Sequence, residues 1–182
     1  MKSLILTLVV VLLATLTAGA QENKKSDVPN NEIAFTYLPM YGTVDKLWYQ
    51  SIGLEWAYGV SHGLGFVANY SYARKSFSAN GINVPAYSIE GNIYTFGGRY
   101  TYRTNKTAAF GEVLFGGFRS GEVGHAQSVT NKLAIQLGGG FDYSLSRNFA
   151  LRMPQVEYTA VSSSNSQTDN LIQIGGGVVW SF

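Results

Sequence analysis

The sequence predicts an all-β protein, an eight-stranded antiparallel transmembrane β-barrel arranged as an up-and-down meander after a cleavable signal peptide. Large apolar residues alternate with small or polar ones along most of the chain beyond residue 31, which is the period of β-strands. Charged residues make up only 13% of the chain, whereas aromatic residues make up 14%. Beyond the N-terminal region there is no apolar run of about 20 residues, the length that a membrane-spanning helix needs. A barrel that places apolar residues at every second position fits all three observations.

The N-terminal region has the three parts of a secretory signal peptide. Lys2 precedes an apolar run over residues 4–16, and small residues follow up to Ala18-Gly19-Ala20. We expect cleavage after Ala20, with Ala18 and Ala20 as the cleavage-site residues. The alternative is an uncleaved anchor helix, but the run is shorter than the roughly 20 residues of a comfortable span.

The remaining chain divides into a short polar segment and one domain. Residues 21–31 are expected to be a flexible periplasmic N-terminal segment, and residues 32–182 to be the outer-membrane β-barrel domain. Eight strands are expected at about 32–38, 48–58, 64–74, 88–103, 108–118, 132–143, 149–160 and 171–182. The connections between them alternate between long and short. Transmembrane barrels have short periplasmic turns and longer external loops, so the four long connections are expected outside the cell.

The two faces of these strands differ in character. In 64–74, for example, Leu64, Phe66 and Tyr70 alternate with Gly65 and Asn69. Small polar residues suit the narrow lumen of an eight-stranded barrel, and large apolar ones suit a surface in contact with lipid. The alternative is a soluble lipocalin-like barrel, in which the apolar face would point inward.

Charged residues on the small, polar face are expected to pair inside the barrel. Buried charges are costly unless they are paired and hydrogen-bonded. The expected lumen charge pairs are drawn from Arg99, Glu112, Glu55, Arg152 and Glu157, and Glu90 and Asp142 are further candidates for the inner face.

Two local features make the expected pairing specific. With Asn105-Lys106 as a two-residue turn, Arg99 lies directly opposite Glu112, with both side chains inward. Pro154 cannot donate a ladder hydrogen bond, so it marks a bulge. Arg152 is then inward before the bulge and Glu157 inward after it.

The C-terminal residues Gly177-Val178-Val179-Trp180-Ser181-Phe182 resemble the C-terminal signal of outer-membrane β-barrels. Gly177, Trp180 and Phe182 match this signal, whereas Gly175 stands where a polar residue is usual. Together with the strand pattern, the chain from about Glu32 resembles small bacterial outer-membrane barrels, the group of the OmpA transmembrane domain and OmpX-like proteins. The resemblance implies that the barrel assembly machinery is a partner during biogenesis, and that the protein is located in the cell outer membrane.

The sequence offers little catalytic or metal chemistry. It has no cysteine and two histidines, His62 and His125. His125 lies three residues before Ser128, and a lipid A-modifying enzyme would need such a pair together with a carboxylate. The 13 basic residues nearly balance the 11 acidic ones, which argues against nucleic acid as a partner. We therefore expect no catalytic residues, no metal site and no cofactor.

These observations predict an integral outer-membrane protein with a structural or surface-interaction role through four external loops. An eight-stranded lumen is just wide enough to be filled by side chains, so an open porin is not expected. The expected partners are outer-membrane lipid and lipopolysaccharide, and the expected state is a monomer. The alternatives are an outer-membrane lipid A-modifying acyl hydrolase or transferase, and a secreted lipocalin-like carrier.

Overall fold

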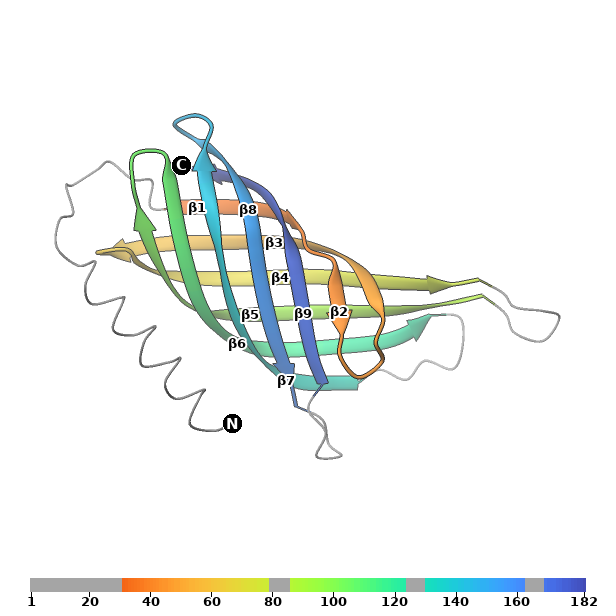
Figure 1. The fold of residues 1–182 in the computed structure, drawn as a ribbon. Coiled ribbons are helices and arrows are strands. Elements are labelled where there is room, and N and C mark those ends of the chain that lie inside the picture. Colours follow the sequence, from red (N-terminus) through yellow and green to blue (C-terminus); the bar gives the residue numbers. More distant parts are fainter. Residues whose placement is uncertain (1–30, 79–85, 124–129, 163–168) are drawn as a thin grey trace, which may run out of the picture.

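The computed structural model confirms the predicted closed antiparallel barrel (Figure 1). It describes residues 31–78, 86–123, 130–162 and 169–182, and within these ranges it contains strands and turns but no helix. The predicted signal peptide with Ala18 and Ala20, and the polar segment up to residue 30, lie outside the described residues. The strands are β1 (Asn31–Tyr37), β2 (Met40–Gly42), β3 (Trp48–Ser61), β4 (Leu64–Phe77), β5 (Tyr87–Arg103), β6 (Thr107–Val123), β7 (Thr130–Ser144), β8 (Phe149–Val161) and β9 (Asp169–Ser181).

The barrel has eight positions for these nine strands because β1 and β2 are two parts of one. Both pair with β3 on one side and with β9 on the other. The interruption falls at Pro39, which has no backbone N–H to donate to a ladder. The expected strands 32–38 and 48–58 left residues 39–47 as a long connection; this was wrong, because pairing resumes at Met40 and only residues 43–47 form the turn. Asn31, expected in the flexible segment, is the first residue of β1.

The hairpin of β4 and β5 is longer than predicted. Its two strands pair without interruption from Leu64 opposite Tyr100 to Phe77 opposite Tyr87, where the two rings stack with centroids 4.8 Å apart. Figure 1 shows this hairpin projecting beyond its neighbours at the long-connection end of the barrel.

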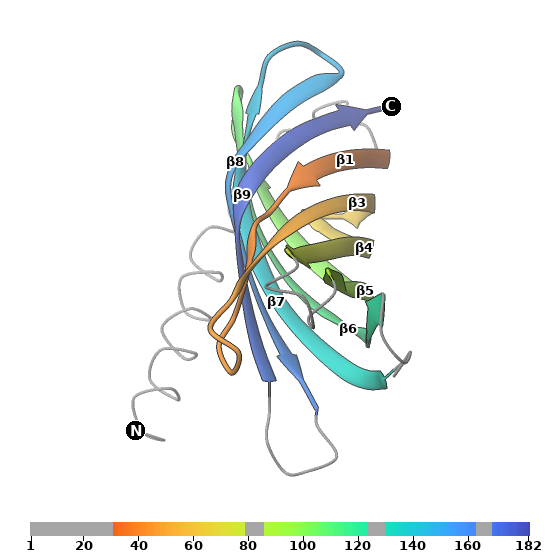
Figure 2. The same cartoon turned by 90° about the vertical axis from the view of Figure 1, so that its right-hand side faces the viewer.

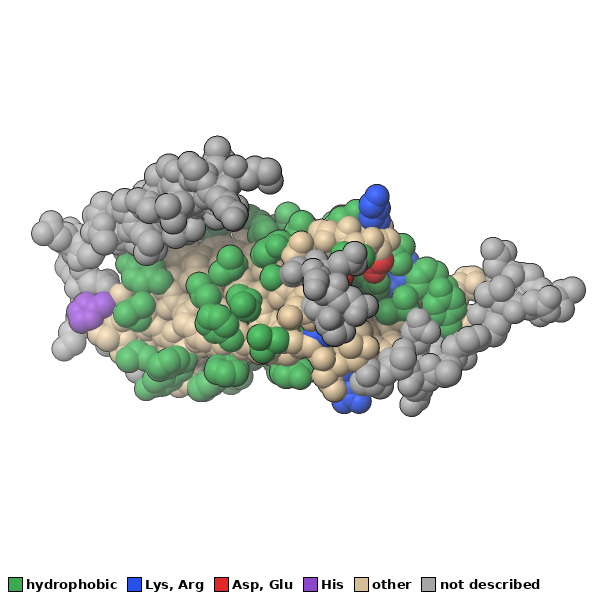
Figure 3. Space-filling model, turned by 90° about the horizontal axis from the view of Figure 1, so that it is seen from below, with side chains coloured by type: hydrophobic (Ala, Val, Ile, Leu, Met, Phe, Trp, Pro, Cys, Tyr) green, Lys and Arg blue, Asp and Glu red, His purple; other side chains and the backbone are tan. Residues whose placement is uncertain are grey.

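The apolar face points outward all around the wall. The described exposed side chains include Phe96 at 68% and Phe66 at 64% of full exposure. Figure 3 shows hydrophobic side chains spread along the barrel wall, with the charged side chains gathered toward one end. A lipocalin-like carrier would bury this face inside, so the structure contradicts that alternative.

At two of the strand junctions, glycines allow neighbouring backbones to approach closely. Side chains at Gly175 and Gly177 in β9 would overlap the backbone of β1, and side chains at Gly97 and Gly116 would overlap the backbone between β5 and β6. The β9–β1 and β5–β6 junctions are separated by four barrel positions on either side. Glycine therefore permits a close approach that a narrow barrel requires at its two opposite corners. At the first corner β1 and β9 run side by side to close the barrel, as Figure 2 shows.

Candidate functional site

Five buried charged side chains form a single network in the middle of the lumen. Arg99 Nη2 lies 2.5 Å from Glu112 Oε2 and 2.6 Å from Glu55 Oε2. Arg152 Nη1 donates to Glu55 Oε1 at 2.6 Å. The same guanidinium donates to both oxygens of Asp142, at 2.7 and 2.9 Å. Glu55 thus connects two arginine–carboxylate pairs across the lumen.

The strand register explains why these pairs form. Arg99 on β5 lies directly opposite Glu112 on β6, so the register predicted from the Asn105-Lys106 turn is confirmed. Arg152 on β8 lies opposite Asp142 on β7 in the same way. Directly opposed side chains have Cβ atoms about 4.5–5.5 Å apart, well within reach of an ion pair.

Phe110 supports both guanidinium groups from within the lumen. Its ring centroid is 4.1 Å from Arg99 Cζ and 4.3 Å from Arg152 Cζ. Such cation–π contacts are worth about 2 kcal/mol or more when desolvated. The sequence analysis missed this residue, although its spacing of two from Glu112 placed it on the inner face.

A bulge in β8 brings Arg152 and Glu157 to the same face. Met153 and Pro154 together oppose a single residue on each neighbour, Phe141 on β7 and Gly176 on β9. In a regular strand, residues five apart point to opposite faces. The additional residue at the bulge allows both side chains to be buried, as expected from Pro154.

Glu157 has different partners from those expected. Its carboxylate accepts hydrogen bonds from Gln136 Nε2 and, at 2.6 Å, from Gln155 Nε2. Within the part of the chain that the structure describes, no Lys, Arg or His side chain forms an ion pair with it. The expected charge pair with Glu157 is absent: Arg152 contacts Glu55 and Asp142 instead, and Arg99 contacts Glu112 and Glu55. The side-chain amides of Gln136 and Gln155 form an amide layer next to Glu157. Thr95 extends this layer by donating to Gln136 Oε1 at 2.7 Å.

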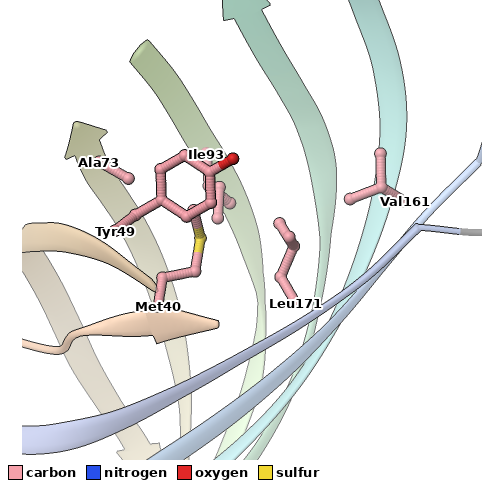
Figure 4. Close-up of a cluster of buried hydrophobic side chains, with 6 residues drawn as sticks. All are labelled: Met40, Tyr49, Ala73, Ile93, Val161 and Leu171. Atoms are coloured by element: carbon pink, nitrogen blue, oxygen red, sulfur yellow. The ribbon is translucent and has the colours of Figure 1, made fainter. Parts of the chain in front are cut away.

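The two ends of the lumen are lined by different chemistry. At the long-connection end lies a buried apolar cluster, shown in Figure 4, made of Met40, Tyr49, Ala73, Ile93, Val161 and Leu171. The expectation of a small, polar inner face was wrong here. At the short-turn end Arg103 Nη2 lies 2.5 Å from Glu32 Oε1.

Glu90, a candidate for the inner face, belongs to the outer wall. The β5 register runs without a bulge, so Glu90 shares the outward position of Tyr94 and Phe96. It lies opposite Arg74, with Arg74 Nε 3.7 Å from Glu90 Oε1. Glu90 and Phe96 lie an even number of positions apart, so the sequence already indicated that both side chains lie on the outer face.

The C-terminal residues that resemble an assembly signal lie at the seam where the barrel closes. Gly177 is at the β9–β1 junction, and the rings of Trp180 and Phe182 are 4.7 Å apart on the outside. Phe182 N donates to Asn31 O at 3.0 Å, which joins the last strand to the first.

The enzyme alternative requires a histidine paired with a serine and a carboxylate. His62 is exposed in the β3–β4 turn with its Nδ1 2.5 Å from Ser61 Oγ, and none of its described hydrogen-bond partners is a carboxylate. His125 and Ser128 lie outside the described residues. Within the described ranges, no three His, Cys, Asp or Glu side chains are grouped so as to hold a metal ion. No helix there has the length and apolar character to cross a membrane.

The fold and its filled, charged core define a small eight-stranded barrel. No protein-family model matches the chain, and no curated protein matches its sequence. Among solved structures, Neisserial surface protein A is similar, with a TM-score of 0.64 and 13% identity over 84% of this chain and 96% of that one. The attachment invasion locus protein Ail of Yersinia pestis, in complex with the heparin analogue sucrose octasulfate, gives a TM-score of 0.57 and 13% identity over 82% and 97%. The N-terminal β-barrel domain of Pseudomonas aeruginosa OprF gives a TM-score of 0.56 and 10% identity over 86% and 100%. These likenesses establish the fold.

Proposed function

We propose that this chain is an integral protein of the bacterial outer membrane, with a structural or surface-interaction role and without an open pore. The outward-facing apolar wall carries the proposal. Soluble monomers rarely expose contiguous apolar patches larger than about 300–600 Å². Here large apolar side chains are exposed on every long strand, from Phe35 on β1 to Trp180 on β9, and a lipid environment would cover them.

The structural neighbours support both parts of this proposal. Neisserial surface protein A is named for the cell surface, and Ail is named for attachment and invasion. On a rigid barrel of this kind, the connections are the parts free to vary and to meet partners.

The filled lumen supports a role other than that of a porin. The central network, the amide layer and the apolar cluster occupy successive levels between the two ends. The purified, refolded barrel is therefore expected to give no stable conductance steps in a planar lipid bilayer. Steps comparable to those of a known porin, measured under the same salt conditions, would contradict a closed lumen.

Cell fractionation and surface labelling test location and orientation. The protein is expected to stay with the outer membrane after a urea wash. An epitope inserted at Asn165, which is outside the described residues, should be accessible to antibody on intact cells, whereas one at Asn105 in the β5–β6 turn should not. Release by urea would refute the membrane location, and labelling at Asn105 alone would invert the orientation.

A further inference from the structure

The outer wall contains an apolar groove that the filled lumen does not explain. It has a volume of about 1130 Å³ and crosses the wall from β4 to β8. Tyr72 on β4 and Ile52 on β3 line one side, Tyr37 on β1 lies along the middle, and Met153 on β8 lines the other side.

The irregularities of β8 and β9 help to form this groove. Gly176 on β9 occupies an outward position where its neighbours Ile174 and Val178 carry branched side chains. Gly176 also stands opposite the Met153-Pro154 bulge, where the β8–β9 pairing is interrupted. A missing side chain next to an interrupted ladder leaves the wall hollowed.

A pair of hydrogen-bond donors stands at the long-connection end of the groove. Gln50 and Arg74 lie directly opposite each other, two residues beyond Ile52 and Tyr72 in the same outward rows. The Tyr37 hydroxyl donates to Gln50 Oε1, which leaves the amide N–H groups of Gln50 free to donate. The Arg74 side chain is 52% exposed, with its Nε 3.7 Å from Glu90 Oε1 and its Nη2 donating to Ser88 Oγ at 3.1 Å.

We propose that this groove and donor pair bind lipid A, with a phosphate at Arg74 and Gln50 and acyl chains along the apolar groove. Guanidinium and amide donors form strong, charge-assisted hydrogen bonds with phosphate oxygens. The volume of the groove is comparable to the roughly 300–1,000 Å³ of pockets for drug-sized ligands, and its apolar lining suits acyl chains. Lipid A combines phosphates with several acyl chains. The inference rests on the proposed outer-membrane location, in which the long-connection end meets the outer leaflet.

Native mass spectrometry of the full-length, refolded barrel in detergent micelles tests this inference, with lipid A or phosphatidylglycerol added as the probe. Arg74→Gln removes the charged donor, and Val178→Trp fills the groove. The matched controls are Arg119→Gln and Val113→Trp, which make the same changes at outward positions on β6, away from the groove. Heat-modifiable mobility in gels verifies that each variant is folded.

Lipid A is expected to remain bound to the wild type and to both controls. Arg74→Gln should weaken its retention about tenfold, the effect of losing one hydrogen bond to a charged group. Val178→Trp should weaken it by a similar factor. Equal retention by all folded variants, an equal loss in the controls, or retention of phosphatidylglycerol as strong as that of lipid A would overturn the assignment. None of these results would affect the urea-wash test, so failure of this inference remains distinct from failure of the proposed location.

Discussion

Breaking the Arg99–Glu112 pair gives the most direct test of the central network. We expect Arg99→Ala to destabilise the barrel strongly, because it leaves Glu112 and Glu55 buried without one of their cationic partners. The Arg99 and Glu112 side chains are only 3% and 0% exposed. Removing one member of a buried ion pair typically costs about 3–5 kcal/mol.

A double-mutant cycle separates the pair from its surroundings. Arg99 donates to Glu112 Oε2 from both Nε and Nη2, at 2.9 and 2.5 Å, and also contacts Glu55. In a Glu112→Ala background, Arg99→Ala loses the contacts to Glu55 and Phe110 but no longer isolates a carboxylate at position 112. The second cost should therefore be smaller, and we expect a coupling energy of about 2–3 kcal/mol, the upper part of the range for residues in contact.

The cycle is measured by reversible urea unfolding in lipid vesicles, followed by tryptophan fluorescence. The Arg74–Glu90 pair supplies a matched control with the same residue types, because its side chains are 52% and 29% exposed and 3.7 Å apart. Exposed pairs of this kind contribute about 0–1 kcal/mol. A coupling energy for Arg99 and Glu112 below about 0.5 kcal/mol, which is the usual deviation from additivity, would refute the network as a stabilising element.

Three further predictions concern assembly and the shape of the wall. Deleting Phe182 should reduce the barrel in the outer-membrane fraction and leave unfolded protein in the periplasm; an undiminished heat-modifiable band would show that the terminal signal is dispensable. Gly116→Val should lower the folded yield, because its side chain would overlap the β5 backbone. Gly98→Val should not, because no atom lies within 4 Å of the added Cβ. Equal folded yields would show that the β5–β6 junction tolerates a side chain at position 116. Deleting Pro154 should preserve the folded barrel, because it makes β8 regular and leaves Arg152 inward. Deleting Val156 should abolish folding, because it turns the Glu157 carboxylate toward lipid. A higher folded yield for the Val156 deletion than for the Pro154 deletion, measured by heat-modifiable mobility in gels, would disprove the assigned bulge.

Local pattern was sufficient to predict much of the barrel. Alternation over 64–74 assigned the two faces of β4, and the Asn105-Lys106 turn fixed the β5–β6 register that sets Arg99 opposite Glu112. Both depend on neighbours in sequence and on a period of two.

Contacts across the lumen could not be predicted in this way. Arg152 reaches Glu55, which is 97 residues away, and this contact depends on how the closed barrel staggers its strands. The apolar cluster was missed for another reason. At Ile93-Tyr94 both the inward and the outward residue are large and apolar or aromatic, so alternation disappears where both faces are covered. The break at Pro39 was visible in the sequence, but the resumption of pairing at Met40 depends on β3 and β9.

The two glycine corners have a consequence for how the chain could be reconnected. They separate β1–β5 from β6–β9, so each half of the wall is one continuous stretch of sequence. The seam residues Asn31 and Phe182 already exchange backbone hydrogen bonds, at 3.0 and 3.4 Å. A circular permutant that joins these residues and opens at the β5–β6 turn would retain every strand ladder while moving Phe182 away from the chain terminus. Its refolding in vitro would report on the geometry that closes the wall, and its insertion in cells would report on whether the position of Phe182 in the chain matters for assembly.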